Sequence, residues 1–364
     1  MLLEVFSLRG AGRGLGPEYA GHMELDTAQI ADAAAQYPFS GVVTQHVGSA
    51  RVFEFAQGFA NRGLAVPVDV DTQFGIASGS KGFTALAIMR LVEEGALRLD
   101  QPVREFLRDD LPLIDEAVTI GHLLEHTSGI GDYIDEDDDE ADVADFVLTV
   151  PVHTLTTAES FIPAIDGLAQ RSEAGAEYVY NNSGYVVLGI VLERVTGVRF
   201  QDAVTQLVLD PAGMTNSGFL HLNDLPGSVA LGYLEPEGNL VNTLHLPIAG
   251  SADGGGFTTA DDMHAFWCAL AAGRIVTADT LDLMVRIRHE DVEDGLASGL
   301  GLYLHPSGRM WALSGYDAGQ SFYSWHIPET QTTATVLGNT SDGSWGVMRT
   351  VMDRVRAEIG SGGS

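Results

Sequence analysis

The sequence predicts an α+β fold, an α/β sandwich with a central antiparallel sheet, together with a mostly helical domain. Three observations support this prediction. Strand patterns occur near the start of the chain, at residues 41–57, and return near its end, at residues 299–337. The residues between them form helical segments and loops. The composition of the 364 residues, 45% hydrophobic and 19% charged, is typical of a folded globular chain.

The first strands are expected to form a hairpin. Residues 41–47 and 51–57 are rich in β-branched and aromatic side chains and flank a short turn that contains Gly48. Glycine takes the positive φ that a tight hairpin turn requires. The chain therefore enters the sheet as two paired strands.

A strand-to-helix junction follows the hairpin. Residues 72–77 are strand-like, and residues 80–94 carry apolar side chains at helical spacing before Gly95, which is a typical helix C-cap. Ser78 lies between the two elements, so we expect it at the N-terminus of the helix.

From about residue 100 to residue 250 the pattern is mostly helical. Helices in this region are separated by loops, and glycine ends the last one at Gly197. The expected helices cover residues 119–126, 135–150 and 184–195.

The C-terminal part returns to strands and closes with a helix. Short β-rich runs separated by turn residues predict antiparallel neighbours in the same sheet as the first hairpin. The expected strands cover residues 299–304, 310–313, 320–327 and 332–337, and the expected helix covers residues 344–359.

These elements predict two domains with the site between them. Residues 23–99 and 251–359 would form the α/β domain, and residues 100–250 the helical domain. Residues 1–22 resemble a vector-derived extension, and residues 360–364 resemble a linker tail.

The charge excludes several function classes. The chain has 19 basic and 50 acidic residues, for a net charge of −31, and such a surface repels nucleic acids and anionic lipid heads. No apolar run approaches the roughly 18 residues of a membrane-spanning helix, and no signal peptide is visible, so we expect a cytoplasmic chain.

Cys268 is the only cysteine and is expected to be a buried thiol. The sequence does not predict the oligomeric state.

Lys81 is the only lysine, because the other 18 basic residues are arginines. Arginine does not release its proton in proteins, whereas a desolvated lysine amine can act as a base. Lys81 is therefore a candidate catalytic base before any motif is considered.

Ser78 and Lys81 form a Ser-x-x-Lys pattern at the predicted helix N-terminus. Residues three apart on a helix share a face, so the lysine amine can reach the serine hydroxyl and activate it as a nucleophile. The backbone N–H of Ser78 could also contribute to an oxyanion hole. The alternative is a capping serine beside an exposed lysine.

A second pattern, Tyr180-Asn181-Asn182, stands directly before a predicted helix. Tyr180 offers a phenol for proton transfer, and Asn182 offers an amide for hydrogen bonding. The alternative is a packed tyrosine followed by an asparagine N-cap.

Four stretches, residues 74–100, 120–133, 178–219 and 254–263, resemble the serine β-lactamase and penicillin-binding-protein superfamily in the same order. The closest branch holds class C β-lactamases, DD-carboxypeptidases and esterases. The resemblance implies a β-lactamase/transpeptidase-like fold and a serine hydrolase without a cofactor. It assigns Ser78 as the acylated nucleophile, Lys81 as its base, Tyr180 as the proton carrier and Asn182 as a substrate-binding amide.

The third family element departs from the pattern. Relatives have Lys-Thr-Gly or His-x-Gly on the strand beside the site. Here Leu313 occupies the cationic position if Gly315 is the family glycine, or Tyr316 does in a shifted register. Either way the cation that binds a substrate carboxylate is missing, and Asp317 adds negative charge. We expect Tyr316 and Asp317 to contact substrate, with the Tyr316 N–H in the oxyanion hole. Small-molecule esters, amides or peptides are therefore favoured over β-lactams.

Two other functions also fit parts of the sequence. His122-x-x-Glu125-His126 matches an inverted zinc-peptidase motif in which both histidines share a helix face. A non-catalytic binding protein with the same fold is the other alternative, but it gives no reason to keep a single lysine beside Ser78.

Overall fold

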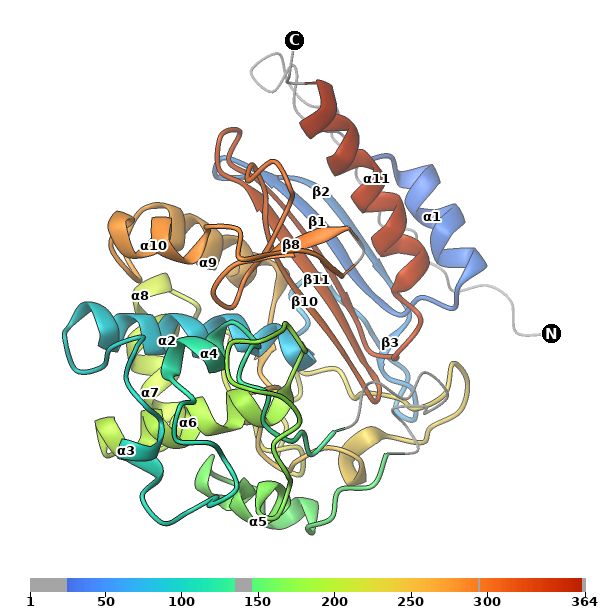
Figure 1. The fold of residues 1–364 in the computed structure, drawn as a ribbon. Helices are drawn as coiled ribbons and strands as arrows, with labels where there is room; N and C mark the ends of the chain where they lie inside the picture. Colours follow the sequence, from blue (N-terminus) through green and yellow to red (C-terminus); the bar gives the residue numbers. More distant parts are fainter. Residues whose placement is uncertain (1–24, 135–145, 294, 362–364) are drawn as a thin grey trace.

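The structure is a computed structural model that describes residues 25–134, 146–293 and 295–361 (Figure 1). The expected extension, most of the helix predicted at 135–150 and part of the C-terminal tail lie outside these residues. In the described part of the chain, no helix is long and apolar enough to cross a membrane.

An eight-stranded antiparallel sheet forms the centre of the fold, in the order β2-β1-β12-β11-β10-β9-β8-β7. The first and last strands are neighbours, because Gly41 pairs with Gly338 and Val47 pairs with Thr332. This pairing confirms the predicted sheet built from both ends of the chain. The strands are β1 (Gly41–Val47), β2 (Ala50–Gln57), β7 (His289–Glu293), β8 (Leu296–Ser298), β9 (Tyr303–Leu304), β10 (Trp311–Asp317), β11 (Gln320–Ile327) and β12 (Thr332–Gly338).

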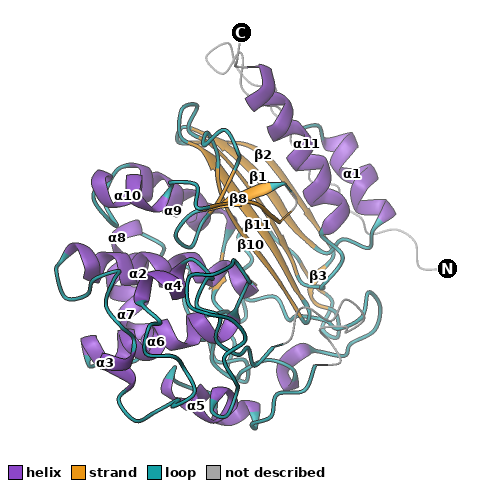
Figure 2. Ribbon diagram, in the orientation of Figure 1, coloured by secondary structure: helices purple, strands orange, loops and turns teal. Residues whose placement is uncertain are grey.

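Helices cover both faces of the sheet, as Figure 2 shows. The terminal helices α1 (Thr27–Gln36) and α11 (Trp345–Ser361) pack together on one face. The remaining helices lie on the other side. These are α2 (Lys81–Glu93), α3 (Arg104–Leu107), α4 (Ile120–Leu124), α5 (Ile162–Ile165), α6 (Asn182–Thr196), α7 (Phe200–Val204), α8 (Asp210–Ala212), α9 (Ala260–Ala271) and α10 (Ala278–Met284). Short strand pairs join β3 (Phe59–Asn61) to β4 (Val66–Pro67) and β5 (Phe74–Gly75) to β6 (Phe257–Thr258).

Strand β1 shows why the sheet is covered on both sides. Val42 and Val43 are both fully buried, but they belong to different hydrophobic cores. Val43 packs in the core beneath α1 and α11, and Val42 in the larger core on the opposite face. Side chains alternate across a strand, so two adjacent valines serve both layers.

Helix α2 lies at the centre of the larger core. Ten of its 13 residues are buried, including Lys81. Its neighbours are α6 and α7 of the region 100–250. The helical region therefore shares its core with α2 and α9 of the flanking segments, and the division into two domains stays a prediction.

Several sequence predictions were wrong in their boundaries. The strand expected at 299–304 is interrupted, because Gly301 makes a turn with φ of +71° and packs against Ala85. Strand β10 continues four residues past the predicted end at 313, since Gly315 pairs with Phe322 of β11. The predicted helix at 119–126 ends at Leu124.

Two further differences concern helices. Residues 146–150, expected to be the end of a helix, form a loop. Helix α1 was not predicted; Asp26 caps it by accepting hydrogen bonds from the N–H groups of Ala28 and Gln29.

Three histidines lie between α9 and the sheet. The rings of His46 and His264 stack with centroids 4.3 Å apart, and His264 and His326 both hydrogen-bond the Thr333 hydroxyl, at 3.0 and 2.9 Å. Burial lowers the pKa of His326 to about 3 and that of His264 to about 4. Cys268, beside His264, is only partly buried, unlike the expectation.

His264 and His326 predict a loss of stability in mild acid. Both side chains are neutral in the folded protein but titrate near pH 6.5 in the unfolded chain, so the unfolded chain binds more protons as the pH falls below 6.5. We expect each to lower the free energy of unfolding by about 2 kcal/mol between pH 7 and pH 5. Denaturant unfolding at several pH values measures this, and His326→Gln should remove its share of the slope. An unchanged pH dependence in that variant would contradict the assignment.

Candidate active site

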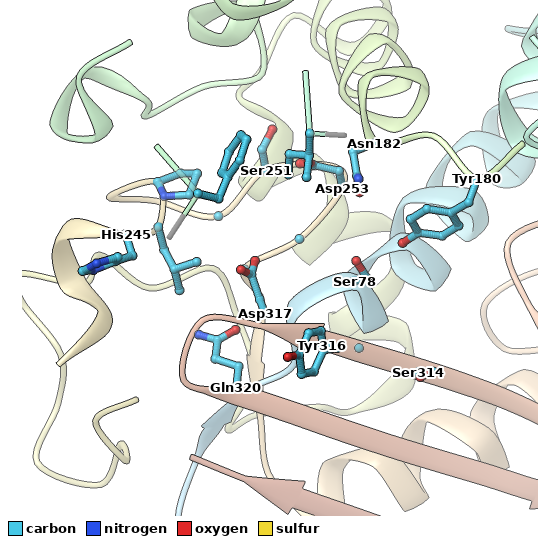
Figure 3. Close-up of a pocket in the computed structure, with 18 of the residues that line it drawn as sticks. Ser78, Tyr180, Asn182, His245, Ser251, Asp253, Ser314, Tyr316, Asp317 and Gln320 are labelled. Carbon is cyan, nitrogen blue, oxygen red and sulfur yellow. The ribbon is translucent and has the colours of Figure 1, made fainter. Parts of the chain in front are cut away.

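A cavity of about 520 Å³ opens between the 3-10 turn before α2, strand β10 and the loops that precede α6 and β6 (Figure 3). Ser78, Tyr180 and Asn182 line it on one side, and Tyr316 and Asp317 line it from β10. The structure thus brings the sequence-predicted site residues to one place, with Lys81 buried beneath Ser78.

Ser78 stands in a tightly held turn, Ala77–Ser80. Ala77 has a positive φ of +44°, and its N–H donates to the side-chain oxygen of Gln320 at 3.1 Å. The Ser80 hydroxyl donates to the carbonyl of Ala77 and accepts from the N–H of Gly256, both at 2.9 Å. A left-handed alanine costs on the order of 1 kcal/mol, and these bonds hold the turn in that conformation.

The Lys81 amine contacts three oxygen atoms. Its Nζ lies 2.9 Å from Ser78 Oγ, 2.7 Å from Asn182 Oδ1 and 2.7 Å from the carbonyl oxygen of Asp253. The Lys81 side chain is 5% exposed, so these contacts take the place of water.

This arrangement accommodates both the ammonium and the neutral form of Lys81. An amide oxygen and a backbone carbonyl can only accept, so Asn182 and Asp253 take two N–H bonds from Lys81. A neutral amine then has its lone pair left for the Ser78 hydroxyl, while an ammonium would donate all three bonds. The contacts therefore fit proton transfer from Ser78 to Lys81.

Tyr180 lies on the other side of the nucleophile. Lys81 Nζ is 4.8 Å from the centre of the Tyr180 ring, and Figure 3 shows the Tyr180 hydroxyl directed towards Ser78. His126 stacks on Tyr180 with ring centroids 4.6 Å apart and on Tyr185 at 4.9 Å. The Tyr180 ring is thus held in place by a second aromatic layer.

His126 is a neutral imidazole. Its Nδ1 accepts the N–H of Asn181 at 3.0 Å, so the proton sits on Nε2. Burial, and next the charge of Lys81, lower the pKa of His126 to about 3. Its backbone has a positive φ of +55°. In the sequence, His126 stood out only as part of the His-x-x-Glu-His motif.

Asn182 is fixed by the start of α6. The Asn181 side chain caps the helix by accepting from the N–H of Gly184 at 2.6 Å. The Asp132 carboxylate accepts from the N–H groups of Asn182 and Ser183, at 2.7 and 2.9 Å. Negative charge at a helix N-terminus is favourable, and burial raises the pKa of Asp132.

Strand β10 packs Gly315 and Leu313 of the third motif against the elements that carry Ser78 and Lys81. A Cβ on Gly315 would come within 2.0 Å of the Ile76 carbonyl oxygen, so the strand packs directly on the turn before α2. Leu313 contacts Gly82 of α2. Alternate residues share a face, so Leu313 and Gly315 lie on the same side of the strand, and the register with Leu313 at the position of the family cation stays a prediction. Among the described residues that line the cavity, none is an arginine or lysine.

Asp253 was missed by the sequence reasoning. Besides its carbonyl bond to Lys81, its carboxylate accepts a short hydrogen bond from the Tyr133 hydroxyl. Burial raises the pKa of Asp253, while Lys81 opposes the rise. In the sequence this residue stands in a glycine-rich turn, and nothing there indicates that it reaches the Lys81 amine.

The zinc-peptidase alternative is not supported. His122 belongs to a capping box, where its Nδ1 accepts the N–H of Thr119 at 3.2 Å. Glu125 pairs with Arg288 at 3.1 Å, and the helix ends before both Glu125 and His126. Within the described residues, no three histidine, cysteine or acidic side chains are grouped as metal ligands.

Sequence comparisons match this chain to known proteins. The model of the beta-lactamase family matches residues 27–357. Esterase EstB of Burkholderia gladioli is 36% identical over 184 residues, which cover 46% of this chain and 44% of the esterase. The chain spans less than two thirds of the length of the curated relatives that it matches first.

Solved structures match over most of the chain. A penicillin-binding protein from Bacillus halodurans is 35% identical and superposes with a TM-score of 0.82. The matched region covers 89% of this chain and 99% of the chain of that protein. D-amino acid amidase from Ochrobactrum anthropi SV3 shares the fold at 24% identity, with a TM-score of 0.74 over 93% of this chain and 98% of its own.

Proposed function

The chain belongs to the beta-lactamase family, and from that membership we propose that it is a serine hydrolase that forms an acyl-enzyme on Ser78. The observation that carries the proposal is the 2.9 Å contact between Ser78 Oγ and Lys81 Nζ, beside two groups that can only accept. The family match confirms the resemblance inferred from the sequence motifs.

Acylation would begin with attack of Ser78 Oγ on a substrate carbonyl. The hydroxyl proton passes to Lys81, and Tyr180 delivers a proton to the leaving group. The N–H groups of Ser78 and Tyr316 would stabilise the oxyanion. Water then attacks the acyl-enzyme, and the same groups carry its proton in reverse.

His126 and Asp253 would act by positioning these groups. His126 holds the Tyr180 ring by stacking and stays uncharged, so it adds no further positive charge beside Lys81. The Asp253 carbonyl oxygen fixes the amine in reach of Ser78.

The substrate would be a small ester, amide or peptide in preference to a carboxylated β-lactam. In the register aligned on Gly315, Leu313 takes the position of the family cation, and the described cavity lining offers no lysine or arginine for a carboxylate. The names of the relatives, an esterase and a penicillin-binding protein, are consistent with acyl transfer to serine.

Lys81→Arg tests the mechanism. It keeps the positive charge but cannot supply a neutral amine, so we expect acylation to fall by at least about 10³-fold, nearly as far as in Ser78→Ala. Intact-mass spectrometry after a fluorophosphonate or an activated ester should show one adduct on Ser78 in the wild type. Arg98→Lys, an exposed exchange in the reverse direction, is the control and should label normally. Wild-type labelling of Lys81→Arg would refute the base assignment.

The missing cation predicts the substrate preference. A hydrogen-bonded charge pair contributes about 2–5 kcal/mol, so we expect kcat/KM for p-nitrophenyl butyrate to exceed that for nitrocefin by about 30- to several-thousand-fold. Leu313→His, which restores a family residue, should narrow this ratio. Equal turnover of the two substrates by the wild type would count against the proposal.

A further inference from the structure

Asp317 is a partly buried carboxylate at the end of β10 that borders the active-site cavity. Its Oδ1 accepts the N–H of Ala318 at 2.7 Å, and its carbonyl oxygen accepts the Ser341 hydroxyl at 3.0 Å. The turn after β10 therefore fixes the carboxylate at the cavity wall. Figure 3 shows the Asp317 carboxylate directed into the cavity, to the left of Ser78 in this view.

The cavity presents more negative than positive charge to a ligand. Its described lining contains two carboxylates, Asp253 and Asp317, and no lysine or arginine. Asp253 is only 7% exposed and accepts a hydrogen bond from the Tyr133 hydroxyl, whereas Asp317 is partly exposed at the cavity wall. Asp317 is therefore the carboxylate best placed to meet a charged group of a bound substrate.

The position of Tyr180 indicates which half of the substrate Asp317 meets. In Figure 3, Tyr180 and Asp317 lie on opposite sides of Ser78. The leaving group must lie on the side of Tyr180, because that phenol supplies its proton. The acyl group then extends to the side of Asp317.

We propose that this site is selective for acyl groups that carry a cationic amine, which Asp317 binds. The proposal rests on the acyl-enzyme function proposed above and specifies its substrate class: amine-bearing esters or amides, with the amine in the acyl half. A carboxylated acyl group would meet Asp317 with like charge and find no cation to bind it.

The test compares ester pairs that differ by one charge. Glycyl, β-alanyl and 6-aminohexanoyl p-nitrophenyl esters are matched with propionyl, butyryl and heptanoyl esters, in which a methyl group replaces the amine. The readout is the ratio of kcat/KM, cationic over neutral, at the spacer that gives the largest ratio. In Asp317→Asn we expect this ratio to fall about ten- to hundredfold, the range for loss of a charged hydrogen bond. The asparagine oxygen can still accept from Ala318, so the turn is preserved.

Two controls separate local recognition from the general attraction of a chain with net charge −31. Asp282→Asn removes one exposed charge from α10, outside the cavity, and should leave the ratio unchanged. Hexanoylthiocholine carries its cation in the leaving group, so its kcat/KM should respond little to Asp317→Asn. Asp317→Lys should reverse the preference towards a p-nitrophenyl monoester of adipic acid.

The outcomes distinguish this proposal from the one on which it rests. If the neutral esters acylate Ser78 but the ratio is the same in the wild type and Asp317→Asn, amine selection by Asp317 is wrong and the hydrolase function stands. If no ester or fluorophosphonate labels Ser78, the hydrolase function itself is wrong. Equal falls in the ratio for Asp317→Asn and Asp282→Asn would also overturn the proposal, because they would indicate only general electrostatic attraction.

Discussion

The burial of the Lys81 amine is the constraint on which the site depends. A polar group taken out of water must regain its hydrogen bonds inside the protein, or it costs several kcal/mol. Lys81 regains them from three segments: the turn at Ser78, the start of α6 at Asn182 and the loop at Asp253. These segments are far apart in the chain, so the fold must bring them together before the amine can be buried. The same three bonds leave the amine facing the nucleophile.

A second layer of buried polar groups fixes the segments that surround the amine. Asp132 accepts from the first N–H groups of α6, and His126 accepts from the N–H of Asn181 while stacking on Tyr180. Each of these side chains accepts a hydrogen bond from a backbone N–H group and also orients a candidate catalytic residue. The geometry of the site is therefore set by side chains that accept hydrogen bonds from backbone N–H groups at the start of a helix and in a loop. The packing of the helices against the sheet holds these segments in place.

The charges of the described cavity lining bear on which substrates the site would attract. Leu313 of β10 packs on Gly82 of α2 and brings no charge to the strand. The carboxylate of Asp317 lies at the opposite end of the same strand segment and remains in the cavity. Under the proposals above, this one strand would offer no cation to an anionic substrate and one carboxylate to a cationic substrate. Substrate class can change in this way without any change to Ser78 and Lys81.

The sequence by itself determined the features that repeat at short range. Strand and helix periodicity gave the hairpin at 41–57 and helix α2, and the spacing of Ser78 and Lys81 placed both on one face. These follow from local geometry, which a few neighbouring residues define. The Tyr-Asn-Asn pattern, together with the family resemblance, also singled out Tyr180 and Asn182, and both line the cavity.

Only the tertiary structure decided the rest. The register that places Leu313 beside Gly82, the bond from Lys81 to Asp253 and the stacking of His126 on Tyr180 join residues more than fifty positions apart. Such contacts depend on how the chain packs, and the sequence near each residue carries no period or spacing that specifies its distant partner. The turn at Gly301, which interrupts a predicted strand, has the same cause, because its shape is set by packing against helix α2.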